Sequence, residues 1–191
     1  MARVEFTANT ARPAIAEAMR KLEGETRQLM LKDWGEYLLR STRDRAKLEQ
    51  DPDGRKWRAL EPSYKRYKDR KRPGVPILKF DFHMLGDMLS WQTDGDDVLL
   101  VGTNAPYGAI HQFGGTIRRA ARSTHAYFHR GRDGEVGNRF VPKNRSNFAQ
   151  RVTVPEYKIT IHPRPWLGVS VADERELLDI AQDHLKAAFE E

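Results

Sequence analysis

The sequence predicts an α+β fold: a single domain with a long N-terminal helix, an antiparallel sheet, a C-terminal helix and an extended inserted hairpin arm. Apolar residues recur at helical spacing near both ends of the 191-residue chain, whereas strand-like alternation occurs only in its middle. Between residues 119 and 155, Gly, Arg, Ser and Asn dominate, as is typical of a surface loop or hairpin. We therefore expect residues 1–191 to form one domain, with residues 119–155 as an inserted arm or loop.

The first predicted element is an amphipathic helix over residues 13–43. Thr10 is a candidate N-cap, and Pro13 suits the first turn. Gly24 and Gly35 lie inside the pattern and predict a break or bend near one of them. The apolar stripe has steps of three, four and seven and consists of Ile15, Ala18, Met19, Leu22, Leu29, Met30, Trp34, Tyr37 and Leu38.

A turn at residues 51–54 separates this helix from a short basic helix that Ser63 can open. Residues 77–91 place apolar side chains on one helical face and predict a further helix. Residues 90–93 and 98–102 predict a β-hairpin with a short acidic turn. The basic helix exposes Lys65, Arg66, Lys68, Arg70, Lys71 and Arg72, which we interpret as a basic surface or as the lining of a lumen.

The inserted segment is predicted to be a hairpin whose turn lies at residues 131–134. Its expected strands are residues 126–128 and 139–141. Strand alternation returns at residues 157–161. The chain then crosses as a rigid extended segment, and Asp173 is expected to cap a final amphipathic helix.

Charge is unevenly distributed along the chain, whose formal net charge is +6 and whose pI is about 9.6. Residues 55–72 and 118–158 are basic, whereas residues 172–191 are acidic. Such a chain can bind nucleic acid or copies of itself. Cysteine is absent, and no apolar run reaches the length of a membrane span. Without a signal-peptide pattern, we expect assembly in the cytoplasm and no membrane partner.

Residues that could support catalysis or bind metal form no recognisable constellation. His125 and His129 have a helical metal-ligand spacing, but their surroundings do not favour a helix. The acidic cluster Asp94, Asp96 and Asp97 suits a solvated turn better than a nuclease metal site. No nucleophile motif and no phosphate-binding loop is present. We therefore expect no enzymatic activity, no cofactor and no metal.

Three sequence blocks resemble the phage virion morphogenesis family, the tail-completion proteins of Mu-like and related contractile-tailed phages. They span residues 51–60, 101–115 and 163–170, and the first is followed by Pro62 and Ser63. The residues that we assign to the fold motif are Tyr107, His111, Gln112, Phe113, Gly114, Gly115, Arg164, Pro165, Trp166 and Gly168. We expect Tyr107 and Phe113 to pack on the sheet, Pro165 to suit a sheet edge, and Trp166 to fill the gap between the sheet and the last helix.

The resemblance implies a structural virion protein with no activity and no cofactor. It suggests a ring-forming tail terminator or neck protein, a hexamer that joins the tail to the head and through which genomic DNA passes. Other tail or neck proteins would be its partners. The alternative is a sequence-independent DNA-binding protein that uses the same basic surfaces. For the ring we expect a subunit interface that includes Tyr127, Phe128, Phe140, Asp173, Glu176 and Asp179.

Overall fold

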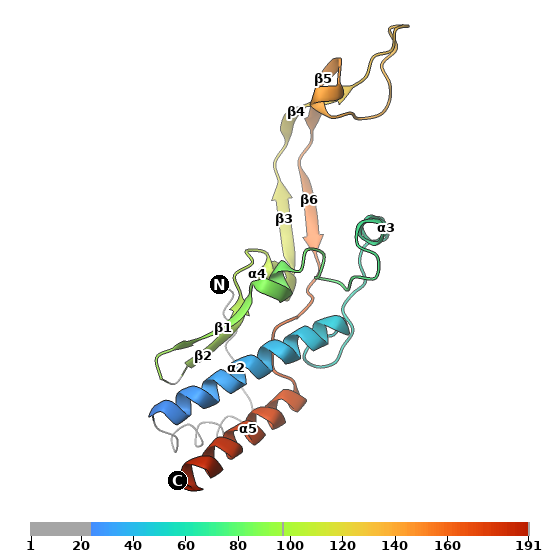
Figure 1. Cartoon of the computed structure of the whole chain (residues 1–191). Helices are drawn as coiled ribbons and strands as arrows, with labels where there is room; N and C mark the ends of the chain where they lie inside the picture. Colours follow the sequence, from blue (N-terminus) through green and yellow to red (C-terminus); the bar gives the residue numbers. More distant parts are fainter. Residues whose placement is uncertain (1–23, 97, 191) are drawn as a thin grey trace. The chain divides into compact units, whose positions relative to one another are not determined.

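The computed structural model describes residues 24–96 and 98–190, which form an α+β fold as predicted (Figure 1). Its residues fall into two compact units. Unit 1 contains the described residues up to Gly114 and from His162 onward, and unit 2 is residues 115–161. The helices of unit 1 are α2 (Gly24–Lys47), α3 (Pro62–Lys71), η1 (His83–Asp87), α4 (Gly108–Phe113) and α5 (Val171–Glu190), and its strands are β1 (Leu89–Asp94) and β2 (Val98–Thr103). Unit 2 contains β3 (Gly115–Arg119), β4 (Arg122–Phe128), η2 (Lys143–Arg145), β5 (Phe148–Val154) and β6 (Tyr157–Ile161).

Helix α2 is the central element of unit 1 and packs against α5, β1 and β2. It ends at Lys47, four residues beyond the predicted end at Arg43. The predicted cap and first turns of this helix lie outside the described residues. Met30, Trp34 and Leu38 of the predicted stripe are buried, whereas Leu29 is 47% exposed and Tyr37 is partly buried. The buried side chains of the helix are Met30, Leu31, Trp34, Leu38, Leu39, Thr42 and Ala46.

Gly35 does not break or bend α2 into two helices, because the helix runs through it without interruption. A Cβ atom at this position would lie 2.5 Å from the Trp91 ring. The Trp91 indole instead packs directly on the helix backbone and donates a hydrogen bond to Glu36 Oε1 at 2.9 Å. Gly35 therefore allows β1 to approach the helix closely.

The core of unit 1 consists of two groups of apolar side chains on either side of α2. One lies between α2 and α5 and is built from Met30, Leu31, Trp34, Leu38, Leu177 and Ala181. The other contains Leu39, Ala46, Trp57, Ile77, Met84, Leu85, Leu89, Ala105, Trp166 and Leu167. Each group draws on segments far apart in sequence, so the three resemblance blocks contribute to the same core.

The predicted helix over residues 77–91 is wrong. Only η1, a single irregular turn, is helical there, and β1 begins at Leu89. Leu78 and Phe82 have φ angles of 65° and 63°, in the left-handed region that an α-helix excludes. The apolar side chains still reach the core, but from an irregular loop whose spacing imitates a helical face.

The predicted β-hairpin of unit 1 is confirmed. Strands β1 and β2 are antiparallel, with Leu89 opposite Thr103 and Asp94 opposite Val98. The described acidic residues Asp94 and Asp96 lie at this turn, while Asp97 lies outside the described residues.

Unit 2 is one antiparallel ribbon with a short interruption. Strand β3 pairs with β6, and β4 pairs with β5. The two ladders share a single register, since Arg119 lies opposite Tyr157 and, three residues later on each strand, Arg122 lies opposite Val154. The interruption contains Pro155, which lacks the N–H that a ladder requires.

The strand partners predicted inside the insertion are wrong. Residues 126–128 pair with residues 148–150, not with residues 139–141. Residues 129–147 form the connection, in which Arg130 and Val136 make an isolated bridge and Val141 donates a backbone hydrogen bond to Tyr127. The predicted turn at residues 131–134 does exist, closed by the Gly134 N–H donating to the Gly131 carbonyl at 3.1 Å.

Helix α5 begins with a reciprocal cap. Ser170 N–H donates to Asp173 Oδ2 at 2.7 Å, and Asp173 N–H donates to Ser170 Oγ at 3.1 Å. The N-cap is therefore Ser170, and Asp173 is the acidic partner three residues into the cap rather than the capping residue itself.

Candidate functional site

The three blocks that carry the resemblance meet in unit 1 around Gln112. This side chain is buried, and its Nε2 donates to the Leu167 carbonyl at 2.9 Å. Its Oε1 accepts the backbone N–H groups of Trp166 at 2.9 Å and Leu167 at 3.0 Å. One amide thus satisfies three backbone groups of a segment that has no regular secondary structure. The fold motif is therefore a cross-link between helix α4 and the last block.

Arg164 and Trp57 extend this cross-link to the first block. Arg164 is 7% exposed and donates from Nε to the Arg58 carbonyl at 3.0 Å and from Nη2 to the Ala59 carbonyl at 3.3 Å. The Trp57 indole donates to the Pro165 carbonyl at 2.9 Å. Pro165 therefore lies in an irregular crossing, not at the sheet edge that its lack of an N–H suggested.

Trp166 does not fill a gap between a sheet and the last helix, as we had expected. It is 1% exposed and belongs to the core group that includes Leu39 and Met84, whereas the α5 residues belong to the other group. Its indole donates to the Gly108 carbonyl at 3.1 Å, which ties it to the start of α4.

The aromatic residues of the second block were also misplaced by sequence reasoning. Phe113 is 64% exposed and Tyr107 is 36% exposed, so neither is a core residue of the sheet. Because residues 108–113 form a short helix, side chains that would alternate on a strand point around a cylinder instead. Gly114 ends this helix with a φ of 72°, which favours glycine, and the chain continues from Gly115 as β3.

Asp173, predicted to lie at a subunit interface, is buried within its own chain at 1% exposure. It forms an ion pair with Arg45, whose Nη1 lies 2.5 Å from Asp173 Oδ2. The hydroxyl of Tyr37 donates to Asp173 at 3.0 Å, and the hydroxyl of Ser41 donates to the same oxygen. Arg45 also donates from Nη2 to the Gly168 carbonyl at 2.7 Å. The carboxylate therefore joins α2 to the start of α5.

The ionisation of this cluster follows from its contacts. Burial alone would raise the pKa of Asp173, but hydrogen bonds from Ser41 and Ser170 and the charge of Arg45 lower that pKa below its usual value. Burial, followed by the negative charge of Asp173, raises the pKa of Tyr37 to about 12. Sequence reasoning missed Arg45, Ser41 and Tyr37. The only signal was the Ser170-x-x-Asp173 spacing of a capping box.

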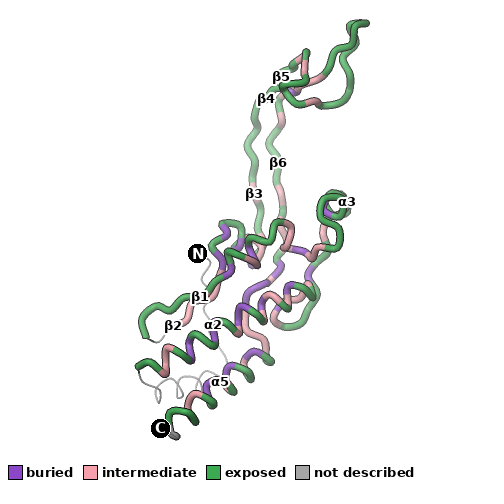
Figure 2. The backbone as a smooth tube through the Cα atoms, in the orientation of Figure 1, coloured by how far each residue is buried: buried purple, intermediate pink, exposed green. Residues whose placement is uncertain are grey.

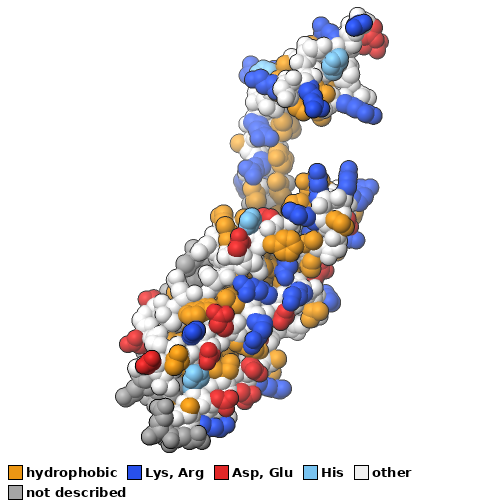
Figure 3. Space-filling model, viewed as in Figure 1, with side chains coloured by type: hydrophobic (Ala, Val, Ile, Leu, Met, Phe, Trp, Pro, Cys, Tyr) orange, Lys and Arg blue, Asp and Glu red, His pale blue; other side chains and the backbone are white. Residues whose placement is uncertain are grey.

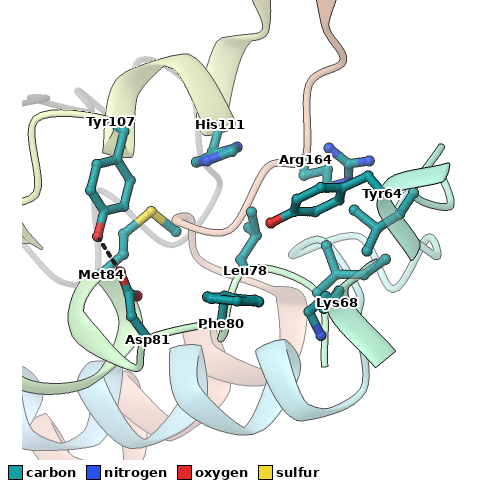
Figure 4. A pocket seen from close by; sticks show the side chains of 11 residues that line it. Tyr64, Lys68, Leu78, Phe80, Asp81, Met84, Tyr107, His111 and Arg164 are labelled. Atoms are coloured by element: carbon teal, nitrogen blue, oxygen red, sulfur yellow. Dashed lines mark hydrogen bonds between the residues drawn. The ribbon is translucent and has the colours of Figure 1, made fainter. Parts of the chain in front are cut away.

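A pocket of about 230 Å³ lies between α3, the loop before η1, and α4, and Arg164 is one of its lining residues (Figure 4). Tyr107 donates a long hydrogen bond to Asp81 Oδ2 at 3.5 Å on one side of it. Phe80, which also lines the pocket, stacks on Tyr67 with ring centroids 6.1 Å apart. The lining side chains are Leu60, Tyr64, Lys68, Ile77, Leu78, Phe80, Asp81, Met84, Tyr107, His111 and Arg164.

His111 is the pocket residue that could act as a general acid or base if the pocket were catalytic. Burial, reinforced by the charge of Arg164, lowers the pKa of His111 below its usual value, so the imidazole is neutral at pH 7. Its Nδ1 atom is buried without a hydrogen-bond partner among the described residues. Its backbone carbonyl accepts the Arg164 N–H at 2.7 Å. No carboxylate within residues 24–96 and 98–190 orients the ring, so the arrangement resembles a packed fold motif more than an acid–base site.

The basic surface on α3 is present without Lys68. That side chain is 3% exposed and donates to the Val75 carbonyl, so it anchors the helix to the following loop. The Nζ atom of Lys65 lies 3.9 Å from Oδ2 of Asp69, one helical turn further along, and forms an exposed ion pair with it. The exposed cations at this surface are Lys65, Arg66, Arg70, Lys71 and Arg72, which we call the α3 basic face.

The predicted aromatic interface residues come together in unit 2. The rings of Phe128 and Phe140 lie 5.2 Å apart, although Phe140 comes from the connection and not from a strand. Phe140 is 77% exposed, and Tyr127 is partly buried. Glu176 and Asp179 are exposed on α5 in unit 1. The structure thus presents the aromatic and acidic parts of the expected interface on different units.

In the described part of the chain, no three His, Asp or Glu side chains are grouped so that they could hold a metal ion. His125 belongs to strand β4, and its ring is near Tyr127 at 6.5 Å between centroids. None of the helices in residues 24–96 and 98–190 combines the length and apolar character needed to cross a membrane.

Comparison with known proteins assigns the class of this molecule. The model of the phage virion morphogenesis family matches residues 7–186 and so includes all three blocks that meet around Gln112. The chain belongs to the phage virion morphogenesis family. Its role is accordingly in the structure or morphogenesis of a phage virion. Comparisons with curated proteins and with solved structures found no match.

Proposed function

We propose that this protein is a ring-forming tail-completion subunit, of the tail-terminator or neck type, that joins the tail to the head during virion morphogenesis. The observation that carries the proposal is the burial pattern of unit 2. All of residues 115–161 are described, and among them Ala126 alone is buried (Figure 2). An isolated two-stranded ribbon is at best marginally stable in water, because it buries too little apolar surface. Contacts outside the subunit would supply that surface.

The apolar contacts of the ring are assigned to the aromatic cluster of unit 2. Phe140 is 77% exposed, and its ring lies 5.2 Å from that of Phe128. Tyr127 precedes Phe128 in β4 and so points to the opposite face of the strand. Exposed aromatic side chains are the usual anchors of protein interfaces. A second copy is the proposed partner, since a cyclic ring places a different surface of each neighbour against this one.

Opposite charges on two helices fit the same head-to-tail arrangement. Glu176 and Asp179 form an acidic face on α5, while the α3 basic face carries five exposed cations. If α5 of one subunit meets α3 of the next, each exposed ion pair contributes about 0–1 kcal/mol. Charge would then determine the register of the ring, and the aromatic contacts its affinity. The family resemblance suggests a ring of six subunits. It also suggests other tail or neck proteins as partners of the ring.

A structural role, without catalysis or a cofactor, fits the pocket in unit 1. Its histidine is neutral and has no orienting carboxylate in the part of the chain that the structure describes, and its arginine donates to two backbone carbonyls. The polar groups that meet there are used by the fold itself. The proposal accordingly assigns His111 and Arg164 to stability and not to turnover.

Light scattering coupled to size exclusion tests the proposal. The full chain is expected to form a discrete ring in the absence of nucleic acid, and Phe140→Asp is expected to reduce it to monomer. Phe113→Asp is the matched control, because Phe113 is also a well-exposed phenylalanine but lies in unit 1. A monomeric full chain, or equal disassembly by both variants, would contradict the proposal.

A second variant tests the ribbon as a whole. Because Arg119 and Tyr157 are directly opposite, residues 120–156 can be replaced by Asn-Gly, which closes a two-residue hairpin. Unit 1 should keep its helical circular dichroism, and the ring should be lost. A shortened protein that still assembles would show that the connecting surfaces lie in unit 1.

A further inference from the structure

The net positive charge of the protein is concentrated in the ribbon of unit 2. Residues 115–161 contain ten Lys/Arg and three Asp/Glu, a net charge of +7, so the rest of the chain is close to neutral at −1. All ten cations are exposed, and Figure 3 shows Lys and Arg side chains along this part of the molecule. They are Arg118, Arg119, Arg122, Arg130, Arg132, Arg139, Lys143, Arg145, Arg151 and Lys158.

These cations have no acidic partners in the described part of the chain. The ion pairs found there, such as Arg45 with Asp173 and Lys47 with Asp44, all lie in unit 1. Arg130 contacts an aromatic ring instead, with its guanidinium 4.5 Å from the centre of Phe148. An excess of exposed, unpaired cations costs free energy through self-repulsion, which an anionic ligand would relieve.

The register of the ribbon places like charges directly opposite each other. Arg118 faces Lys158 across the β3–β6 ladder. Directly opposed like charges weaken a β-ladder. This pair therefore does not stabilise the isolated ribbon.

Alternation along the strands distributes the cations over both faces of the ribbon. Residues directly opposite each other share a face, so Arg118 and Lys158 lie on one face of the β3–β6 ladder. Ile117, Ile159 and Arg119 lie on the other face. A ligand that contacts either face therefore meets positive charge.

We propose that the exposed cations of unit 2 bind duplex DNA through its phosphate backbone, without reading the base sequence. The inference goes beyond the proposed ring and does not depend on it, because it rests on charge and register within one subunit. DNA is the partner whose charge density fits. Fourteen residues on each strand give the ribbon a length of about 46 Å. Duplex DNA of that length carries about 27 negative charges.

An acidic protein surface such as helix α5 fits less well. That helix is about 30 Å long and carries Glu176, Asp179 and Asp183 as clearly exposed acids. These three exposed acids among the described side chains of α5 are too few to compensate ten cations spread along a longer ribbon. Residues 171–188 as a peptide are therefore the competing ligand in the experiment.

Fluorescence anisotropy of the full chain with a labelled 30-base-pair duplex of arbitrary sequence tests the proposal. Affinity should fall steeply as KCl is raised from 50 to 300 mM, and should change little between unrelated duplex sequences. The variant R118Q/K158Q should bind at least about tenfold more weakly at 100 mM KCl, and the slope of log K against log salt should fall by about two. Its fold should be unharmed, since it removes a cross-strand repulsion.

The matched control is K32Q/R175Q, which removes two exposed charges from unit 1. It should change DNA affinity by less than about threefold, because these positions lie off the ribbon. No binding by the full chain at 50 mM KCl, or equal losses in the two variants, would overturn the proposal. So would tighter binding of the α5 peptide than of DNA.

Light scattering on the same proteins keeps this proposal separate from the ring. An R118Q/K158Q protein that forms the ring but binds DNA weakly supports DNA binding by the ribbon. A variant that loses the ring and still binds DNA normally would overturn it, since these cations would then serve a neighbouring subunit. A full chain that binds DNA as a monomer would contradict only the proposed ring.

Discussion

Replacing Asp173 by alanine should destabilise the protein more than almost any other substitution of a charged residue. Asp173 accepts hydrogen bonds from Tyr37, Ser41, Arg45 and the Ser170 N–H, so its removal affects four donors at once. The side chain of Arg45 is 12% exposed and that of Asp173 2% exposed. Water therefore cannot replace the lost carboxylate at Arg45.

The magnitude follows from the buried guanidinium that the substitution leaves behind. Removing one partner of a buried ion pair costs about 3–5 kcal/mol, since the remaining charge is uncompensated. Hydrogen bonds to charged groups contribute about 1.5–3 kcal/mol each but share the same carboxylate, so their values do not add. We expect a loss of about 3–5 kcal/mol, which is a large part of the 5–15 kcal/mol typical of a whole domain.

Urea denaturation followed by circular dichroism at fixed protein concentration measures this loss. Asp179→Ala is the control, because Asp179 is an exposed acid on the same helix and its loss should change stability by no more than about 0.5 kcal/mol. The double variant Arg45→Met/Asp173→Leu should recover much of the stability lost in Asp173→Ala. A loss below about 1 kcal/mol in Asp173→Ala would refute the argument, as would a double variant less stable than the single one.

Three further changes test the packing and electrostatics of unit 1. Gln112→Met should cost about 2–5 kcal/mol in the free energy of unfolding, because it leaves polar groups of residues 166–167 buried without partners. Gly35→Ala should destabilise by about 1–3 kcal/mol despite the higher helix propensity of alanine, because its Cβ would overlap Trp91. Finally, the pKa of Asp173 is lowered in the folded state, so its contribution to stability is present above about pH 4 and is lost as the pH falls through the folded pKa. The stability difference between the native protein and Asp173→Asn should therefore shrink between pH 5 and pH 2.

Controls separate these effects from general damage. Gln150→Met changes an exposed glutamine of unit 2 and should leave the urea midpoint of unit 1 unchanged. Gly35→Ala combined with Trp91→Ala should show a smaller penalty than the two substitutions added together, since the overlap disappears with the indole. If Gly35→Ala stabilised the protein by itself, the close approach of β1 to α2 would be contradicted. A pH-independent effect of Asp173→Asn would show that the carboxylate is not held ionised by its neighbours.

Several features of this protein could be predicted from local sequence alone. The α2 stripe and the β1–β2 hairpin follow from periodicity and from a short acidic turn with glycine, which are properties of neighbouring residues. The excess of Lys and Arg in unit 2 can likewise be counted from the sequence, and it predicted a basic surface. The family could be named from the sequence because the order and composition of the three blocks can be recognised without knowing their contacts in the fold.

Other features depend on contacts between residues far apart in the sequence and therefore could not be predicted from it. The apolar spacing of residues 77–91 fits a helix, but tertiary packing draws these side chains into the core from a loop with two left-handed residues. Lys68 and Asp173 look like surface charges in a polar stretch, and each is buried by partners that the fold supplies. The pairing of residues 126–128 with residues 148–150 was decided by a register that runs the length of the ribbon, because a hairpin turn fixes only the residues next to it. The sequence alone thus determined which residues could form helices, turns and charged faces, whereas the tertiary structure decided which charges remain exposed, since burial depends on the partner surface that covers each side chain.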